Sequence, residues 1–296
     1  MVFIKQLNYW YRKYLPKSLQ NKIKQIMPEF IEFYFLSRKA KKNQDFSGHG
    51  EAKEISKYVD KLIENEKYFV DIGASDGVNS SSTLMFAKKE EWRGLSIEFD
   101  RSKFSKLSYV YKKFKNIDLL NEKITPNNID TILKNSNVPN KFTLLNLDID
   151  SYDLSVLTTL LNKNYRPKII SMEINEKFPP PLYFNVLFDS DHFWKGDHFF
   201  GCSLSAAYTN LNKYGYILVR LQFNNAIFLD PSYFLDEKSK TPEIAYNEGY
   251  RNKPEREKLF SYNKDVDCLL SMNVEDSIKF INEMFSDYKD KYELKI

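Results

Sequence analysis

From residue 68 onward, short apolar runs alternate along the chain with amphipathic stretches of about ten residues. The apolar runs have the length and composition of buried strands, and the stretches between them have the periodicity of helices. We expect strands at residues 68–72, 94–99, 116–124, 141–149, 167–175, 216–222 and 226–231. We expect helices at residues 79–92, 101–114, 127–135, 153–163 and 201–215. This alternation predicts an α/β fold with a parallel sheet covered on both faces.

The last two expected strands flank residues 223–225 (Phe-Asn-Asn), which favour a hairpin turn, so we predict that these two strands are antiparallel. Residues 236–257 are rich in Lys, Glu, Pro and Asn and are expected to form a surface loop. The pattern divides the chain into an N-terminal extension, a central α/β domain and a C-terminal loop and helical extension, at residues 1–50, 51–235 and 236–296.

Positive charge is concentrated at the N-terminus. Residues 1–42 hold ten Lys or Arg against two Glu, whereas the whole chain has a net charge of +4, so the remainder is acidic. Because the basic charge is confined to the extension, nucleic-acid binding is not expected. Cys202 and Cys268 lie far apart without metal-ligand spacing, which disfavours a disulfide framework or a zinc site. We find no signal-peptide pattern and no apolar stretch of about 18 residues, so we expect a cytoplasmic location.

The sequence FVDIGASDG places two glycines and two carboxylates at the end of the first expected strand. Gly73 and Gly77 allow unusual backbone dihedrals and a close approach of a ligand to the main chain. Their spacing differs from the G-x-G-x-x-G of dinucleotide sites, and Asp76 in the turn would repel a phosphate, which argues against an NAD-dependent enzyme. Glu98, at the end of the second strand, is placed to accept the hydroxyls of a ribose. A nucleoside without phosphates fits this site best.

VDIGASDG and SIEFD resemble the first two motifs of class I S-adenosylmethionine-dependent methyltransferases. LLNLDIDSYDLSVL and PKIISMEIN resemble the later motifs of the FkbM-type branch, whose members methylate hydroxyls of sugars and glycan-like compounds. The resemblance covers roughly residues 66–230 in order and spacing. It implies a Rossmann-like fold with a mostly parallel seven-stranded sheet and a reversed final strand, preceded here by the basic N-terminal helical extension.

The resemblance also implies which residues bind the cofactor, S-adenosylmethionine. Asp76 would lie near the amino group of its methionine part, and Glu98 would hold its ribose. As an alternative, the glycines form an ordinary turn between strand and helix, and Glu98 is a solvated strand end. The implied cofactor-binding residues are Asp71, Gly73, Ser75, Asp76, Gly77, Glu98 and Asp148.

A second group of acids occurs in LDIDSYD and in MEIN of the following strand. Strand alternation puts Asp148 and Asp150 on one face, and likewise Glu173 and Asn175. Such oxygen ligands suit Mg²⁺, which would hold a sugar diol and lower the pKa of the reacting hydroxyl. We predict that the ligands are Asp150, Glu173 and Asn175, with Asp148 one pleat deeper, and that Asp150 is required for catalysis. Alternatively, Asp153 caps the next helix and the neighbouring acids form local hydrogen bonds.

The irregular segment 175–201 places His192 and His198 among aromatic residues. Long irregular segments at this edge of a sheet often form binding loops, and histidine takes up a proton near neutral pH. We predict that His198, flanked by Asp197 and Gly201, is the general base. Alternatively, the aromatic side chains anchor the core and each histidine forms a structural hydrogen bond.

Residues 1–42 interleave aromatic side chains with lysine and arginine. Such a segment suits peripheral contact with an anionic membrane surface, packing of its aromatic side on the rest of the chain, or dimerisation. For the whole chain, the sequence favours an O-methyltransferase that acts on a hydroxyl of a sugar or glycan intermediate. The alternative is a non-catalytic nucleoside-binding or regulatory protein that keeps the methyltransferase fold.

Overall fold

The computed structural model describes residues 16, 29–63 and 67–296, in two units that comprise residues 1–43 and 44–296. In the first unit, helix α3 spans Glu29–Ala40 and carries two basic residues in its last turn, where positive charge favours the helix. Most of the segment for which we predict membrane contact lies outside the described residues. Among the described residues, no helix has the length and apolar character needed to cross a membrane.

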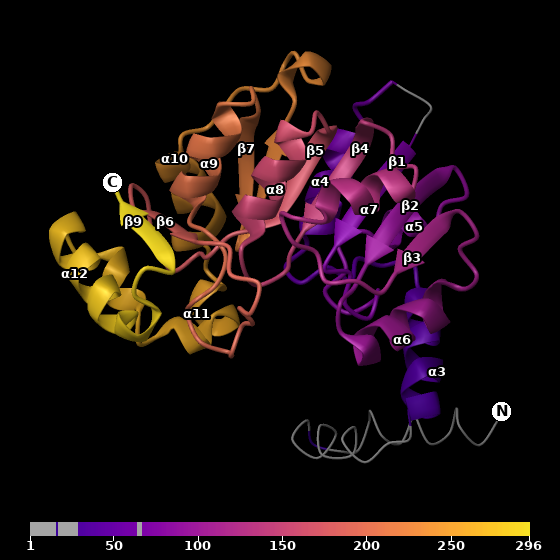
Figure 1. The fold of residues 1–296 in the computed structure, drawn as a ribbon, viewed down its shortest axis with the longest axis horizontal. Helices are drawn as coiled ribbons and strands as arrows, with labels where there is room; N and C mark the ends of the chain where they lie inside the picture. The colour runs from indigo at the N-terminus through magenta and orange to yellow at the C-terminus, as the bar shows by residue number, and fades with distance from the viewer. Residues whose placement is uncertain (1–15, 17–28, 64–66) are drawn as a thin grey trace. The chain divides into compact units, whose positions relative to one another are not determined.

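Within residues 67–296, seven strands form one sheet in the order β3-β2-β1-β4-β5-β8-β7 (Figure 1). Strand β8 is antiparallel to both β5 and β7, and the other neighbouring pairs are parallel. The structure therefore confirms the predicted sheet and its reversed strand. The strands are β1 (Lys67–Ile72), β2 (Trp92–Ile97), β3 (Ile117–Leu120), β4 (Lys141–Leu147), β5 (Arg166–Glu173), β7 (Ile217–Gln222) and β8 (Asn225–Leu229).

Helices cover the sheet on two faces, and Figure 1 shows α8 and α9 in front of it and α4 behind it. Apolar side chains from the sheet and from α8 and α9 form the main core. Helix α4 (Glu51–Val59) precedes β1, buries Ala52, Ile55 and Val59, and exposes its lysines. The helices between the strands are α5 (Leu84–Ala87), α6 (Arg101–Tyr111), α7 (Ile129–Asn135), α8 (Asp153–Asn162) and α9 (Leu204–Asn212).

The long helix predicted for residues 79–92 is wrong, since only α5 forms there. Three serines precede α5, and serine competes with helix formation by bonding to nearby backbone groups. The Ser81 hydroxyl accepts a hydrogen bond from the amide of Leu84 at 3.1 Å, and Ser80 has a φ of 56°. This segment therefore forms a turn before the helix begins.

The surface loop predicted for residues 236–257 is also wrong. Helix α10 (Pro242–Tyr246) continues into a π-helical turn (Asn247–Arg251), and Tyr246 and Tyr250 are buried. Gly249 packs so closely on β7 that an added Cβ atom would lie 2.1 Å from the carbonyl oxygen of Leu221. The polar composition of this segment concealed an inward-facing tyrosine pair.

A second, smaller core lies beside the main sheet, where β6 (Tyr183–Val186) pairs with the C-terminal strand β9 (Tyr292–Lys295). Helix α12 (Val274–Met284) contributes Ile281 to this core. We call residues 265–296 the C-terminal module. The remaining short helices are η1 (Pro231–Tyr233), α11 (Arg256–Leu259), η3 (Ser261–Asn263), and, within the module, η4 (Asp267–Leu270) and η5 (Ser286–Tyr288).

Candidate functional site

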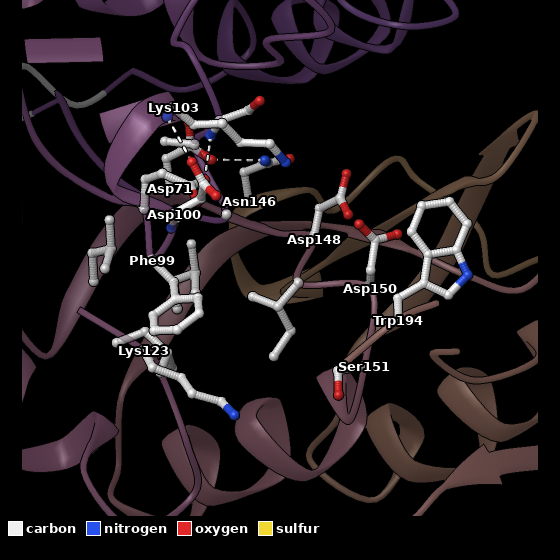
Figure 2. Close-up of a pocket in the computed structure, with 18 of the residues that line it drawn as sticks. Asp71, Phe99, Asp100, Lys103, Lys123, Asn146, Asp148, Asp150, Ser151 and Trp194 are labelled. Atoms are coloured by element: carbon white, nitrogen blue, oxygen red, sulfur yellow. Dashed lines mark hydrogen bonds between the residues drawn. The ribbon is translucent and has the colours of Figure 1, made fainter. Parts of the chain in front are cut away.

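A cavity of about 560 Å³ opens at the carboxyl ends of β1, β2 and β4, where open α/β sheets bind ligands. Its wall includes residues 73–75, 98–100, 148–152 and 192–194. Figure 2 shows Asp71 and Asn146 in one part of the cavity and Asp148, Asp150 and Trp194 in another. We name these parts the cofactor half and the acceptor half, after the ligands that the sequence predicts for them.

Gly73 brings the turn after β1 against the end of β4. Its φ is 91°, and an added Cβ atom would lie 1.7 Å from the carbonyl oxygen of Asp148. Gly77 has a different role, because its Cβ atom would lie 2.5 Å from Leu107 and 2.7 Å from Tyr111, both on α6. Gly73 therefore shapes the cavity wall, whereas Gly77 allows α6 to pack and is not part of that wall.

Asp71 is held by two neighbouring side chains that the sequence did not reveal. Its carboxylate accepts hydrogen bonds from Thr83 at 2.5 Å and from Asn146 at 2.8 Å. Burial raises the pKa of Asp71 to about 6, although both hydrogen bonds lower it. Asp71 and Asn146 are opposite each other in the pairing of β1 with β4, a register that the sequence alone does not specify.

Glu98 joins the end of β2 to the turn after β1. One carboxylate oxygen accepts from the amide of Ser75 at 2.8 Å, and the other accepts from the amide of Asp100 at 2.6 Å. A carboxylate has about four lone-pair sites, so each oxygen keeps a site for a ligand hydroxyl. The structure thus places Ser75 and Glu98 together at the cavity.

Asp76 lies outside the cavity wall. Its carboxylate accepts hydrogen bonds from the amides of Val78 and Asn79, at 2.9 and 2.7 Å, and from the Asn79 side chain at 2.5 Å. Such bonds from an Asp to residues just after it are typical of turns. In this structure, Asp76 stabilises its own turn.

Three carboxylates meet at the acceptor half, and two of them, Asp148 and Asp150, belong to the cavity wall. Oxygens of Asp148, Asp150 and Glu173 all lie within 4.8 Å of one another, and we call these residues the acid cluster. Burial raises the pKa of Asp148 and Glu173 well above their usual values, and the neighbouring acids raise them further. Asn224 donates a hydrogen bond to Glu173 at 2.6 Å from the β7–β8 turn. The cluster favours a proton or a cation, because like charges at this separation repel.

The acid cluster contains Asp148 in place of Asn175, so it differs from the predicted set of metal ligands. Asn175 is 0% exposed, and its amide donates to the carbonyls of His198 and Phe200, both at 2.9 Å. The prediction extended strand alternation beyond the strands, but β4 ends at Leu147 and Asp150 has a φ of 52°. The chain therefore turns Asp148 and Asp150 toward the same point.

Asp153 shapes the loop that carries two of these acids. Its carboxylate accepts from the amides of Ile149 and Ser151, at 2.9 and 3.0 Å. Burial raises the pKa of Asp153 to about 6 against the effect of these hydrogen bonds. The loop conformation at Asp150 is thus fixed from the first turn of α8.

The two histidines of the irregular segment lie in different surroundings. His198 is 2.9 Å from Asp265 of the C-terminal module and is not part of the cavity wall. His192 contributes to the wall, its Nε2 atom is buried without a partner, and burial lowers its pKa. His192 is therefore the histidine closer to the cavity, whereas His198 connects the segment to the C-terminal module.

Residues 187–201, which we call the cover loop, reach from one half of the cavity to the other. Lys123 donates to the carbonyl of Ser190 at 2.5 Å, and its Nζ lies 3.8 Å from the ring centroid of Phe193. Phe193 also contacts Phe99, with 5.8 Å between ring centroids. Next to Ser190, Asp189 ties the loop to the C-terminal module through an ion pair with Lys291, at 3.0 Å.

Comparison with known proteins gives a match only among solved structures, since no family model and no curated protein matches the chain. A SAM-dependent methyltransferase from Aquifex aeolicus is 15% identical over 65% of this chain and 95% of its own, with a TM-score of 0.38. A methyltransferase of the same cofactor class from Clostridium acetobutylicum is 11% identical over 68% and 97%, with a TM-score of 0.38. The N-terminal domain of EvdMO1, solved in the presence of SAH and D-fucose, is 10% identical over 77% and 89%, with a TM-score of 0.33.

These similarities are too low to carry an argument about activity, so the fold is defined by the sheet itself. Its strand order, with β8 reversed between β5 and β7, is that of the Rossmann-like class I methyltransferases.

Proposed function

We propose that the protein is an S-adenosylmethionine-dependent O-methyltransferase that acts on a hydroxyl of a sugar or glycan intermediate. The main support is that one cavity contains both a carboxylate suited to a ribose, Glu98, and two carboxylates of the acid cluster, Asp148 and Asp150. The close approach of Gly73 to Asp148 joins these two parts. A methyl donor bound along the cofactor half would therefore present its methyl group to an acceptor beside the cluster.

The cofactor half suits a nucleoside that lacks phosphates. Asp71 and Glu98 both belong to the wall of the cavity. Both charges disfavour a pyrophosphate, whereas a ribose diol would donate to Glu98. Phe99, which is 50% exposed at the wall, offers an apolar surface for a base.

The acid cluster suits either proton transfer or a divalent cation. In the reaction, the bond from the sulfonium sulfur to the methyl carbon breaks as the bond to the acceptor oxygen forms. The hydroxyl proton would pass to the carboxylate of Asp150, which is oriented by Asp153 through the loop between them. The three carboxylate oxygens also fit the ligand preference of Mg²⁺. When bound, this ion would lower the pKa of the acceptor hydroxyl.

Calorimetry with S-adenosylmethionine and NAD⁺, followed by transfer of a labelled methyl group to a panel of methyl glycosides, tests the proposal. We expect binding of S-adenosylmethionine, no binding of NAD⁺, and label on at least one glycoside. Binding without transfer to any hydroxyl acceptor would instead support a non-catalytic nucleoside-binding protein. Failure to bind S-adenosylmethionine would refute the proposal.

A further inference from the structure

Trp194 stands beside the acid cluster with its ring in a fixed orientation. Its indole nitrogen donates to the carbonyl of Asp197 at 2.7 Å, and its ring meets Phe200 edge-on at 5.8 Å between centroids. Trp194 is nevertheless 46% exposed, and Figure 2 shows it next to Asp150 in the acceptor half. A large aromatic surface is therefore held in place but left uncovered.

The orientation of Trp194 is set from the C-terminal module. The carboxylate of Asp197 accepts from the Tyr288 hydroxyl at 2.5 Å and from the amide of Phe199 at 3.1 Å. Tyr288 also stacks on Phe199, with 3.9 Å between centroids and 4° between ring planes. Because Asp197 is fixed through its side chain, its carbonyl fixes the indole.

We propose that Trp194 is the platform on which a pyranose ring of the acceptor stacks, with one hydroxyl directed at the acid cluster. This inference rests on the proposed function and names the part of the acceptor that is recognised. A pyranose has an apolar face of C–H groups and a rim of hydroxyls. The apolar face stacks on the ring of Trp194, and the hydroxyls donate hydrogen bonds to the carboxylates of Asp148 and Asp150.

The surroundings favour a pyranose over a flat aromatic diol. An aromatic acceptor is apolar on both faces and would be best enclosed between two apolar walls. Next to Trp194, however, the cavity is bounded by Asp148, Asp150 and Ser151. The acidic wall also disfavours an acceptor with a negative charge near the reacting hydroxyl.

Saturation-transfer NMR on the full chain with S-adenosylhomocysteine bound tests this inference. The probes are the methyl pyranosides of glucose, galactose, mannose and fucose, with catechol as the aromatic arm. We expect magnetisation transfer to the C–H protons of at least one pyranoside. W194A should weaken that binding at least tenfold, and W194F should weaken it less than threefold.

L235A is the control, because Leu235 is 88% exposed and is not part of the cavity wall. It should leave pyranoside binding unchanged. Three outcomes would overturn the inference in a protein that still binds S-adenosylhomocysteine. These are unchanged pyranoside binding by W194A, magnetisation transfer only to catechol, and no magnetisation transfer to any pyranoside. Loss of nucleoside binding by the wild type would instead refute the proposed function.

Discussion

The two halves of the cavity are built in opposite ways. In the cofactor half, the carboxylates of Asp71 and Glu98 each accept two hydrogen bonds from groups of the central domain. In the acceptor half, three carboxylates lie within 4.8 Å of one another, and the aromatic wall is held by the C-terminal module. The hydrogen-bonded carboxylates of the cofactor half give a rigid binding site. The neighbouring negative charges of the acceptor half are unfavourable until a proton, a cation or a ligand binds there. Such local strain is typical of sites where chemistry occurs.

The largest effect should come from G73A, which tests how strictly the two halves are joined. The added methyl would meet the Asp148 carbonyl at 1.7 Å in a backbone with φ 91°. We expect a loss of roughly 3 kcal/mol or more in the free energy of unfolding and loss of cofactor binding. G215A is the matched control, because its φ is 85° and no atom lies within 4 Å of its Cβ position. It should cost only about 1 kcal/mol. Equal thermal melts for the two variants would contradict the role given to Gly73.

The next effect separates chemistry from binding. D150N should lower turnover on the order of 10²-fold or more and leave the Kd for S-adenosylmethionine within about twofold. E98A should do the reverse and weaken cofactor binding about tenfold or more, because a charged hydrogen-bond acceptor is lost. Calorimetry and initial rates on both variants measure the two effects. A D150N enzyme with full activity would show that the acid cluster is not at the reacting hydroxyl.

Removal of divalent cations tests whether the acid cluster binds Mg²⁺ or acts through proton transfer to Asp150 alone. If Mg²⁺ occupies the acid cluster, EDTA should abolish turnover, and added Mg²⁺ should restore it. Cofactor affinity in the presence of EDTA should stay within about twofold, since Glu98 belongs to the other half. Full activity after EDTA treatment would exclude the metal part of the proposal and leave Asp150 as the proton acceptor.

The pH dependence of stability should be smaller in size but clear in sign. Asp71 and Asp153 have pKa values raised to about 6, above the usual 3.8, so the folded state holds their protons more tightly than the unfolded chain. Their contribution is therefore full at low pH and is lost as the pH rises from about 4 through 6. We expect the free energy of unfolding to fall on the order of 1 kcal/mol or more between pH 5 and 7. Chemical denaturation at these two pH values measures it, and a rise across this interval would contradict the assigned shifts.

The smallest effect concerns the connection between the C-terminal module and the acceptor half. Y288F removes the hydroxyl that bonds to Asp197 but keeps the ring stacked on Phe199. We expect a twofold to fivefold increase in KM for the acceptor, corresponding to roughly 0.5–1 kcal/mol, with kcat and cofactor affinity nearly unchanged. A lower kcat at constant KM would indicate that Tyr288 acts on the chemical step instead.

The sequence was sufficient for the sheet because strand and helix periodicities are local properties. It also located Gly73 and Glu98, since the motif that contains them lies at strand ends, where ligands bind. It misplaced Asn175 because the backbone beyond β4 and β5 no longer alternates. Thr83 and Asn224 were missed because their contacts with Asp71 and Glu173 depend on which strands and turns become neighbours.

The C-terminal module was not predicted from the sequence for the same reason, because it depends on which strands become neighbours. Strands β6 and β9 are separated by more than a hundred residues of chain, and each is short, so neither has a strong pattern of its own. Phe184 of β6 and Tyr292 of β9 both contact Phe199, the residue on which Tyr288 stacks. No local signal could have assigned these C-terminal residues to the acceptor half. Long-range pairing of short strands is the least predictable part of a fold.

A crystal structure with bound S-adenosylhomocysteine tests the division of the cavity most directly. We predict that both ribose hydroxyls lie within hydrogen-bond distance of Glu98 and that the sulfur faces the acid cluster. A nucleoside bound elsewhere, or a sulfur directed away from Asp148 and Asp150, would contradict the assignment of the two halves.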